Sequence, residues 1–363
     1  MKYTKDELCY IWIDSFSKIE YRHKKELFNL ISGKGEIKKL LLDGRDYVVN
    51  NIGQTEYDTL VASANPSYLD YVISSLEKRD IVAITIVSED YPKSLLQTDF
   101  PPLVLYAKGN VKLLSERSFS IVGSRKSLPL SINVAKDYAN ALIDANFTLV
   151  TGIAEGVDEA VLDAAVKKRA KVISVVAGGL DHIYPKSNMS LAEKVVKTGL
   201  LISEYPPEIA PQRYMFPVRN RIIAALSVGT LIVSAGLKSG TLYTAEYATE
   251  YGKDVFAIPY SVGVASGQGC NDLIKRGVSL TDTPNDILEF YGVENKKEQI
   301  ELTEQEQSIV SVLSDGEMHI DKISERVNKP VYEILTVLSM LEIKNVIVKN
   351  GANVYGLVRN LEG

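Results

Sequence analysis

Apolar positions in the first part of the chain follow a helical period. In residues 1–80, apolar side chains recur at spacings of three and four, as at Leu27, Leu30 and Ile31. Such spacing places apolar residues on one face of a helix. Short glycine-containing breaks separate the periodic stretches. The pattern predicts a small helical domain over residues 1–80.

The middle of the chain, residues 81–290, alternates between short β-branched runs and amphipathic stretches. Strand, glycine turn, helix and strand in this order are typical of a doubly wound parallel sheet. The prediction is therefore an α/β fold with a Rossmann-like, doubly wound, mostly parallel sheet. The strands are expected at Ser118–Val122, Phe147–Val150, Lys171–Val176, Leu200–Ser203, Thr230–Val233 and Asp254–Ile258.

Glycines follow four of these predicted strands, at Gly123, Gly152, Gly178 and Gly236. Doubly wound sheets bind ligands at the carboxyl ends of their strands. Any ligand site is therefore expected beside these glycines.

The last part of the chain predicts a second, smaller unit. Residues 291–302 are polar and predict a linker, and residues 303–363 predict a compact module. Three helices followed by two strands around a turn are the order of a winged helix-turn-helix. The expected helices are Gln307–Leu313, His319–Val327 and Val331–Glu342, and the expected strands are Val346–Lys349 and Val354–Val358.

Charge and composition narrow the function classes. The net charge of −5 argues against a protein whose whole surface binds nucleic acid. Residues 105–290 hold 20 Lys and Arg against 18 Asp and Glu, so a polyanion site there must be a local cluster. No long apolar run predicts a membrane helix, and the N-terminus does not resemble a signal peptide. Two distant cysteines predict neither disulfide nor zinc site, and a cytoplasmic location is expected.

The strongest chemical signal is the segment around the first glycine turn. Gly123, Ser124, Arg125 and Lys126 follow a predicted strand and precede a predicted helix. Backbone N–H groups, a hydroxyl and a guanidinium at such a place suit a phosphate. The alternative is a tight turn that simply requires glycine. The three-glycine pattern of dinucleotide enzymes is missing.

A second signal combines an aromatic residue with arginines. Phe216 lies near Arg213, Arg219 and Arg221, and Asn220 lies between the last two. Base stacking together with phosphate neutralisation requires these residue types. The alternative is an exposed helix face.

Three further segments lie at the predicted sheet edge. Gly152 and Gly156 would let a ligand backbone approach closely, or would serve only turn geometry. Small polar residues open another predicted helix, where the candidates are Ser239, Gly240 and Thr241. The third segment, residues 267–277, adds the candidates Asn271 and Lys275.

Catalytic and metal signatures are missing from the sequence. There are only three histidines, no Ser-His-Asp arrangement and no phosphate-binding Gly-Lys-Ser/Thr loop. His182 has no neighbouring histidine or cysteine to share a metal. The prediction is a site that holds phosphate without chemistry, with no cofactor, no metal and no enzymatic activity.

The ordered motifs resemble one family, the bacterial DNA-processing proteins DprA or Smf. The resemblance spans residues 85–290, and the N-terminal helices, as a SAM-like domain, and the C-terminal module also suit it. The matching segments are Tyr91-Pro92, Phe100–Gly109, Val122–Arg125, Thr151–Ala154, Tyr184-Pro185, Ser203–Pro206, Phe216–Arg221, Ser239–Thr241 and Gly269–Ile274.

The resemblance implies binding of single-stranded DNA without sequence preference and a homodimer formed through the Rossmann-like domain. It also implies protection of incoming DNA in natural transformation and loading of the RecA recombinase. The family's phosphate pocket corresponds to Gly123, Ser124 and Arg125. Its other DNA contacts correspond to Arg213, Phe216 and Arg219.

Three residues depart from the family pattern. The family commonly has a basic residue at Glu155, His at Leu162, and Gly at Tyr260. These departures bear on affinity for DNA more than on the fold.

Two other functions remain open. Ser239-Gly240-Thr241 with Glu246 loosely resembles a motif of the LOG-type nucleoside monophosphate hydrolases, in which Arg125 and Glu246 would handle a nucleotide. A nucleotide-sensing regulator that binds duplex DNA through the winged helix is the other. Residues 291–363 hold 8 Lys and Arg against 12 Asp and Glu, which disfavours duplex binding and suits protein interaction.

Overall fold

A computed structural model describes residues 3–30, 37–293, 302–344 and 346–357. The chain forms two compact units, Met1–Asn295 and Lys296–Gly363. The predicted linker, 291–302, lies mostly outside the described residues. Its first residue, Tyr291, belongs to the first unit, because its hydroxyl donates to Asp254 Oδ2 at 2.8 Å.

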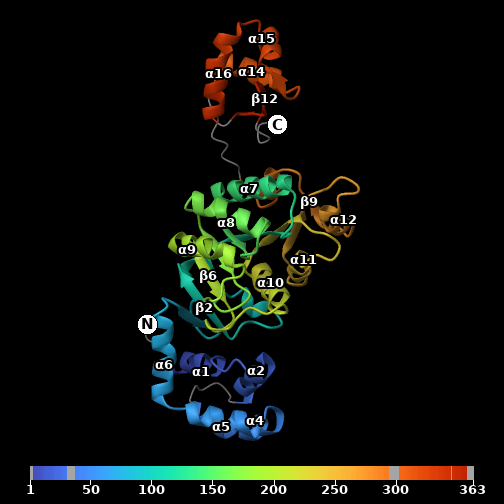
Figure 1. The fold of residues 1–363 in the computed structure, drawn as a ribbon. Helices are drawn as coiled ribbons and strands as arrows, with labels where there is room; N and C mark the ends of the chain where they lie inside the picture. Colours follow the sequence, from blue (N-terminus) through green and yellow to red (C-terminus); the bar gives the residue numbers. More distant parts are fainter. Residues whose placement is uncertain (1–2, 31–36, 294–301, 345, 358–363) are drawn as a thin grey trace. The chain divides into compact units, whose positions relative to one another are not determined.

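A nine-stranded sheet forms the centre of the first unit (Figure 1), in the order β1-β2-β6-β5-β4-β3-β7-β8-β9. All six predicted strands are present, as β3 to β8. Strands β6-β5-β4-β3-β7-β8-β9 pair in parallel, and β1 and β2 add an antiparallel edge. The strands are β1 Val82–Thr85, β2 Val104–Gly109, β3 Ser118–Gly123, β4 Thr148–Thr151, β5 Val172–Val175, β6 Leu200–Ser203, β7 Gly229–Ser234, β8 Asp254–Ala257 and β9 Ser279–Leu280.

Helices cover both faces of this sheet, as a doubly wound fold requires. Successive strand residues point to opposite faces, so Ile121 packs into the core with α7, α8, α9 and α13, whereas Val122 packs into the core with α10, α11 and α12. The predicted α/β fold is confirmed. The helices are α7 Pro129–Asp144, α8 Val157–Lys167, α9 Met189–Thr198, α10 Met215–Leu226, α11 Thr241–Glu250, α12 Gln268–Lys275 and α13 Pro284–Phe290, with short 3₁₀ turns at Leu95–Gln97, Val111–Ser115, Lys186–Asn188 and Ala265–Gly267.

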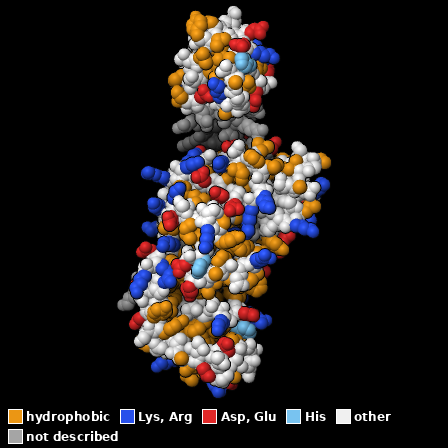
Figure 2. Space-filling view, viewed as in Figure 1, with side chains coloured by type: hydrophobic (Ala, Val, Ile, Leu, Met, Phe, Trp, Pro, Cys, Tyr) orange, Lys and Arg blue, Asp and Glu red, His pale blue; other side chains and the backbone are white. Residues whose placement is uncertain are grey.

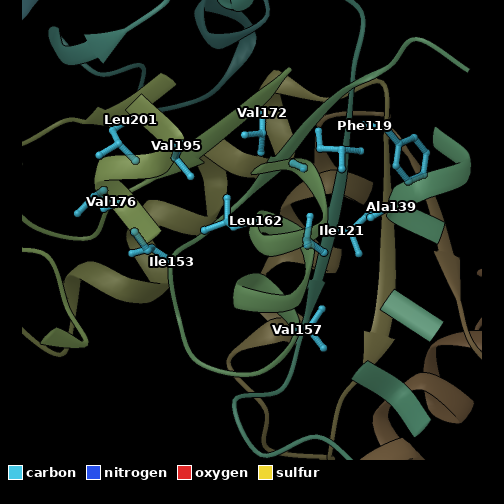
Figure 3. Packing of buried hydrophobic residues seen from close by; sticks show 14 of the residues in the cluster. Phe119, Ile121, Ala139, Ile153, Val157, Leu162, Val172, Val176, Val195 and Leu201 are labelled. Atoms are coloured by element: carbon cyan, nitrogen blue, oxygen red, sulfur yellow. The ribbon is translucent and has the colours of Figure 1, made fainter. Parts of the chain in front are cut away.

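One departure from the family pattern lies inside this packing. Leu162 of α8 is fully buried and points into the apolar layer among Ile121, Val172 and Val195 (Figure 3). It is therefore a core residue, and it does not reach the carboxyl ends of the strands through its side chain.

The N-terminal helices form a small core of their own around Trp12, Leu27 and Leu60. They also contact the α/β part of the same unit: the Tyr106 hydroxyl of β2 donates to Asp14 Oδ2 at 2.9 Å, and Asp14 is paired with the buried Lys24. A domain boundary near residue 80 stays a prediction, since these contacts join both parts in one unit. The helices are α1 Lys5–Asp14, α2 Tyr21–Leu30, α3 Ile37–Asp43, α4 Arg45–Asn51, α5 Gln54–Ser63 and α6 Pro66–Glu77.

The second unit has the predicted winged helix-turn-helix order. Asn328 ends α15 in the left-handed region and Pro330 precedes α16, which makes the sharp turn between the two helices. A short extra strand, β10, completes a three-stranded sheet in the order β10-β12-β11. The elements are α14 Glu304–Leu313, β10 Met318–His319, α15 Ile320–Val327, α16 Val331–Ile343, β11 Ile347–Lys349 and β12 Val354–Leu357; Val358, predicted to end the last strand, lies outside the described residues.

Two general features concern the sequence predictions on membranes and metals. No helix in the described part of the chain is long and apolar enough to cross a bilayer. Among the described residues, no cluster of three or more His, Cys, Asp or Glu side chains could hold a metal ion. Both cysteines are buried, and neither belongs to a disulfide.

Candidate functional site

The sheet topology creates a crevice beside β3. The chain leaves β3 toward β4 on one side, and later returns to add β7 on the other side. Ligands bind at such switch points, outside the carboxyl ends of the strands. An open cavity of about 460 Å³ lies there. Its lining is Val122, Gly123, Ser124, Arg125, Lys126, Ala154, Asp158, Phe216, Pro217, Arg219, Asn220, Ile223, Ser239, Gly240, Thr241, Tyr243 and Thr244.

Ten of the sixteen predicted site residues line this cavity. They come from three segments far apart in sequence: the turn after β3, the first half of α10, and the start of α11. Gly123, Ser124, Arg125 and Lys126 come from the turn. Phe216, Arg219 and Asn220 come from α10, and Ser239, Gly240 and Thr241 from the start of α11.

The turn after β3 is fixed by packing and by β7. A side chain on Gly123 would come within 2.5 Å of Val157 Cγ2, so only glycine fits. The Ser124 N–H donates to Ser234 O at 2.9 Å, and α7 begins only at Pro129. The backbone N–H of Ser124 is therefore bonded within the protein, and α7 begins close to the expected helix start near Leu130. The cationic groups of this turn are the side chains of Arg125 and Lys126.

Arg125 and Phe216 form one contact rather than two separate functions. The Arg125 guanidinium carbon lies 4.8 Å from the centre of the Phe216 ring, a cation–π distance. The Tyr184 ring, from the loop after β5, lies edge-on to Phe216 with the ring centres 5.8 Å apart. Arg125, Phe216 of α10 and Tyr184 thus form a group of contacts between one guanidinium and two aromatic rings.

Two buried residues of opposite charge, Arg219 and Asp158, line the floor of the cavity. Arg219 donates to Val175 O and, through Nε, to Asn220 Oδ1 at 3.1 Å. Burial raises the pKa of Asp158, and the positive charge of Arg219 opposes that rise. Burial also lowers the pKa of Arg219 to about 10, against the effect of Asp158, so Arg219 stays charged at neutral pH.

Gly152 explains how this pair fits beneath the sheet edge. A side chain there would come within 2.3 Å of Asp158 Oδ2 and 2.7 Å of Arg219 Nη1. Gly152 therefore makes room for the side chains of Asp158 and Arg219. Gly156 serves the turn in the same way: its φ is +86°, and a side chain would meet the carbonyls of Ser124 and Arg125.

The start of α11 is a place where uncharged groups favour an anion. The Ser239 hydroxyl donates to Thr241 Oγ1 at 3.0 Å, and the Asn220 amide donates to Gly240 O at 3.1 Å. These bonds hold the first turn of a ten-residue helix against the cavity. The amino end of a helix favours negative charge because its N–H groups and dipole point outward.

Arg221 has a structural position that differs from the predicted one. It forms two bonds to the Glu204 carboxylate, at 2.9 and 2.6 Å, and donates to Phe100 O at 3.1 Å. Its side chain is only 6% exposed. The helical period explains this, because Arg219 and Arg221 point to different sides of α10. The guanidinium of Arg221 is occupied by protein groups.

The other predicted residues outside the lining are Arg213, Asn271 and Lys275. Arg213 is exposed just before α10, and Lys275 is exposed at the end of α12. Asn271 holds the backbone of Tyr260 by two hydrogen bonds, at 3.0 and 2.9 Å. Its role in the structure is to fix the loop after β8.

Tyr260, a departure from the family pattern, has its own place in that loop. Its hydroxyl donates to Val233 O at 2.8 Å and lies 2.8 Å from Ser131 Oγ. A side chain on Gly267 would overlap the Tyr260 ring at 1.9 Å. The bulky residue is thus accommodated by a glycine elsewhere, and the loop is held to β7 and α7.

Sequence reasoning missed Asp158, Tyr243 and Tyr184 as site residues. Asp158 and Tyr184 both lie in segments singled out for their glycines and motifs, but their side chains gave no signal of where they point. Tyr243 lies two residues into α11, where its helical position turns it to the cavity. Only the packing of α8, α11 and the loop after β5 brings these residues to the site.

Family models match most of the chain. A model described as DNA recombination-mediator protein A matches residues 82–292. A second model, described as DprA winged helix domain, matches residues 294–351.

Known proteins show the same similarity. DNA processing protein DprA of Bacillus subtilis is 38% identical over 222 residues, which cover 61% of this chain and 75% of that protein. The X-ray structure of DNA processing protein A from Streptococcus pneumoniae is 29% identical and covers 75% of this chain and 98% of that chain, with a TM-score of 0.57. A structure of the Helicobacter pylori protein, described as showing a unique single-stranded DNA binding mode, is 29% identical with a TM-score of 0.53 and covers 58% of this chain and 95% of that chain.

Proposed function

This chain belongs to the DNA recombination-mediator protein A family, also called DprA or Smf, and on that premise we propose that it binds single-stranded DNA without sequence preference and without catalysis. The observation that supports this most is the Arg125–Phe216 contact at 4.8 Å in the cavity beside β3. A guanidinium for phosphate and a ring for bases are the two groups that sequence-independent binding needs. The single-stranded DNA described for the H. pylori relative is the ligand of the same chemistry.

The charge distribution supports a local site. The net charge is −5, and Lys and Arg lie interspersed with Asp and Glu over the face seen in Figure 2. Arg125 and Lys126, beside the amino end of α11, are therefore the groups expected to attract phosphate. Because bound phosphates release counterions, affinity should fall steeply as salt rises.

The test compares ligands rather than variants. Labelled single strands of different sequence, and a duplex of one of them, are titrated by fluorescence anisotropy at two salt concentrations. Strong salt dependence, little sequence dependence and weaker duplex binding are expected. Equal affinity for single-stranded and duplex DNA, or an affinity that does not depend on salt concentration, would contradict the proposal.

The proposal extends to the cellular role that the family description suggests. We expect the bound strand to be DNA taken up during natural transformation, protected by this protein and passed to RecA recombinase. Assembly of RecA on a single strand, followed with and without this protein, tests the second step. No acceleration of RecA assembly would restrict the function to strand binding.

A homodimer through the α/β unit is part of the same proposal. Leu280 on the edge strand β9 is 49% exposed, and Phe290 of α13 is 56% exposed and packs edge-on against Phe256 of the neighbouring β8. Exposed apolar side chains beside an unpaired strand edge suit a protein interface. Sedimentation of the full chain and of a Leu280→Glu variant tests it: a monomer in the variant alone supports the interface.

The structure gives the alternative enzymatic function no added support. Glu246, the carboxylate that a nucleotide hydrolase of the LOG type would need, is exposed on α11 and lies outside the cavity lining given above. The regulator hypothesis needs a basic recognition helix, and α16 contains no Lys or Arg.

A further inference from the structure

Tyr184 lies outside the cavity lining, but its ring contacts Phe216, which lines the cavity. Arg125 lies over the Phe216 ring inside the cavity, and the Tyr184 ring also meets Phe216, with ring centres 5.8 Å apart and planes at 72°. Half of the Tyr184 surface is exposed. An exposed aromatic ring that adjoins a strand-binding site is available to a base.

The backbone around Tyr184 is anchored on both sides. Before it, the Asp181 N–H donates to Pro207 O at 3.0 Å, and Ile183 is buried. After it, the buried Asn188 donates its amide to Ile153 O at 3.0 Å. The segment therefore holds the ring in place before any ligand arrives, which lowers the entropy lost when a base stacks on it.

We propose that Tyr184 forms a second nucleobase subsite, which receives the base next to the one stacked on Phe216. This inference rests on the proposed single-strand function. The two ring planes meet at 72°, so bases that each stack on one ring are not parallel to one another as bases in a helical stack are. The two rings therefore suit successive bases of an extended strand better than a helical stack.

The direction of the strand follows from the residues around this subsite. Lys186, two residues beyond Tyr184, is exposed and offers a cation for the next phosphate. Glu155 accepts a hydrogen bond from the Ser187 hydroxyl at 3.3 Å and adds a negative charge on the same side. A strand therefore runs from α11 and Arg125 over Phe216 to Tyr184, and leaves past Lys186.

The main experiment uses two ligands of equal length: oligothymidine, and a strand of abasic sites that has sugar and phosphate only. Tyr184→Ala should weaken oligothymidine binding on the order of ten-fold. It should leave binding of the abasic strand unchanged, because only the base contact is lost. The slope of affinity against salt should also stay as in the parent protein.

Two controls separate stacking from support of Phe216. Tyr184→Phe keeps the ring and should bind like the parent, whereas Tyr71→Ala removes a comparably exposed tyrosine from α6 and should change nothing. Tyr184→Ala should weaken binding further in a Phe216→Ala background. If the double variant binds like Phe216→Ala alone, Tyr184 acts only through Phe216 and the subsite is refuted.

The remaining outcomes distinguish failure of the Tyr184 subsite from failure of the proposed single-strand binding. Parent-like binding of oligothymidine by Tyr184→Ala, or an equal loss on the abasic strand, refutes the subsite and leaves single-strand binding intact. If the parent protein binds no strand at all, the proposed function itself has failed.

Discussion

Helices α10 and α16 have nearly the same length, 12 and 13 residues, but they present different chemistry at their surfaces. Helix α10 brings Phe216 and Asn220 to the cavity, beside the guanidinium of Arg125. Helix α16 follows the turn of a helix-turn-helix, where a recognition helix usually enters the major groove. Under the proposed function, α10 and not α16 would contact the strand.

The exposed side of α16 carries apolar and acidic side chains and no cation. Its outward residues include Tyr332 at 72%, Leu335 at 44% and Ile343 at 78% exposure, and its only charged residues are Glu333 and Glu342. Without Lys or Arg, this helix cannot neutralise phosphates. In this chain the fold element best known for binding DNA therefore lacks the required groups, and an irregular turn after β3 supplies them.

Helix α10 adds a second lesson, because its own arginines are not the exposed cations of the site. Arg219 and Arg221 are each 5% exposed: Arg221 is paired with Glu204, and Arg219 donates to Val175 O near the charge of Asp158. A charged residue in a motif shared with the family can thus be buried and bind other protein groups instead of a ligand. The distinction depends on which side of the helix faces solvent.

The largest expected effect tests this structural role of Arg221. Glu204→Gln should lower the free energy of unfolding by about 3–5 kcal/mol, because it leaves a buried guanidinium without its counter-ion. Urea unfolding followed by circular dichroism measures it. Glu116→Gln is the matched control, since its pair with Lys171 is exposed and should matter by less than about 1 kcal/mol. Equal stability of both variants would show that Arg221 does not need Glu204.

The next effect concerns Arg125. Arg125→Ala should weaken single-strand binding by about 10- to 150-fold and flatten its salt dependence, because a charge-assisted phosphate contact is lost. Titration at several salt concentrations measures both. Lys275→Ala, an exposed cation on α12 outside the cavity lining, is the control and should bind like the parent.

Phe216 sharpens this prediction. Because Arg125 lies on the Phe216 ring, the effects of Arg125→Ala and Phe216→Ala should not add. The double variant should lose less affinity than the two single losses together. Strict additivity would mean that the two side chains bind the strand independently.

A smaller effect, in the opposite direction, is expected from Glu155. Glu155→Lys places a cation beside the cavity where the family commonly has a basic residue. Affinity should rise a few-fold, and the salt slope should steepen by about 0.7 for one added phosphate contact. Glu116→Lys, two residues before β3 and so away from its carboxyl end, should leave both unchanged. A weaker complex with Glu155→Lys would place the strand elsewhere.

The smallest effect tests α16. Leu335→Ser, and separately deletion of residues 302–363, should change single-strand affinity by less than about two-fold, as expected of sites outside an interface. The same titration measures it. A ten-fold loss in either folded variant would make the winged-helix module part of the DNA site and would erase the difference between the two helices.

The sequence predicted what depends on local patterns. Six β-branched runs gave β3 to β8, because each strand is buried on both faces and reads as a continuous apolar segment. Strands β1, β2 and β9 were not predicted: β9 has only two residues, and β1 and β2 form the antiparallel edge, outside the alternation of parallel strands and helices. Motif order also predicted ten of the cavity residues, because strand ends in a doubly wound sheet meet at one edge.

Tertiary structure alone decided what each motif residue does. Arg125, Arg219 and Arg221 are the same residue type, and the sequence alone does not distinguish their roles. In the structure Arg125 reaches the cavity, Arg219 lies at its floor, and Arg221 pairs with Glu204. Burial and ion pairing depend on neighbours from β5, α8 and the loop after β6, and these are distant in sequence. The contact between Tyr184 and Phe216 is of the same kind, because 32 positions separate two rings that only the folded loops bring together.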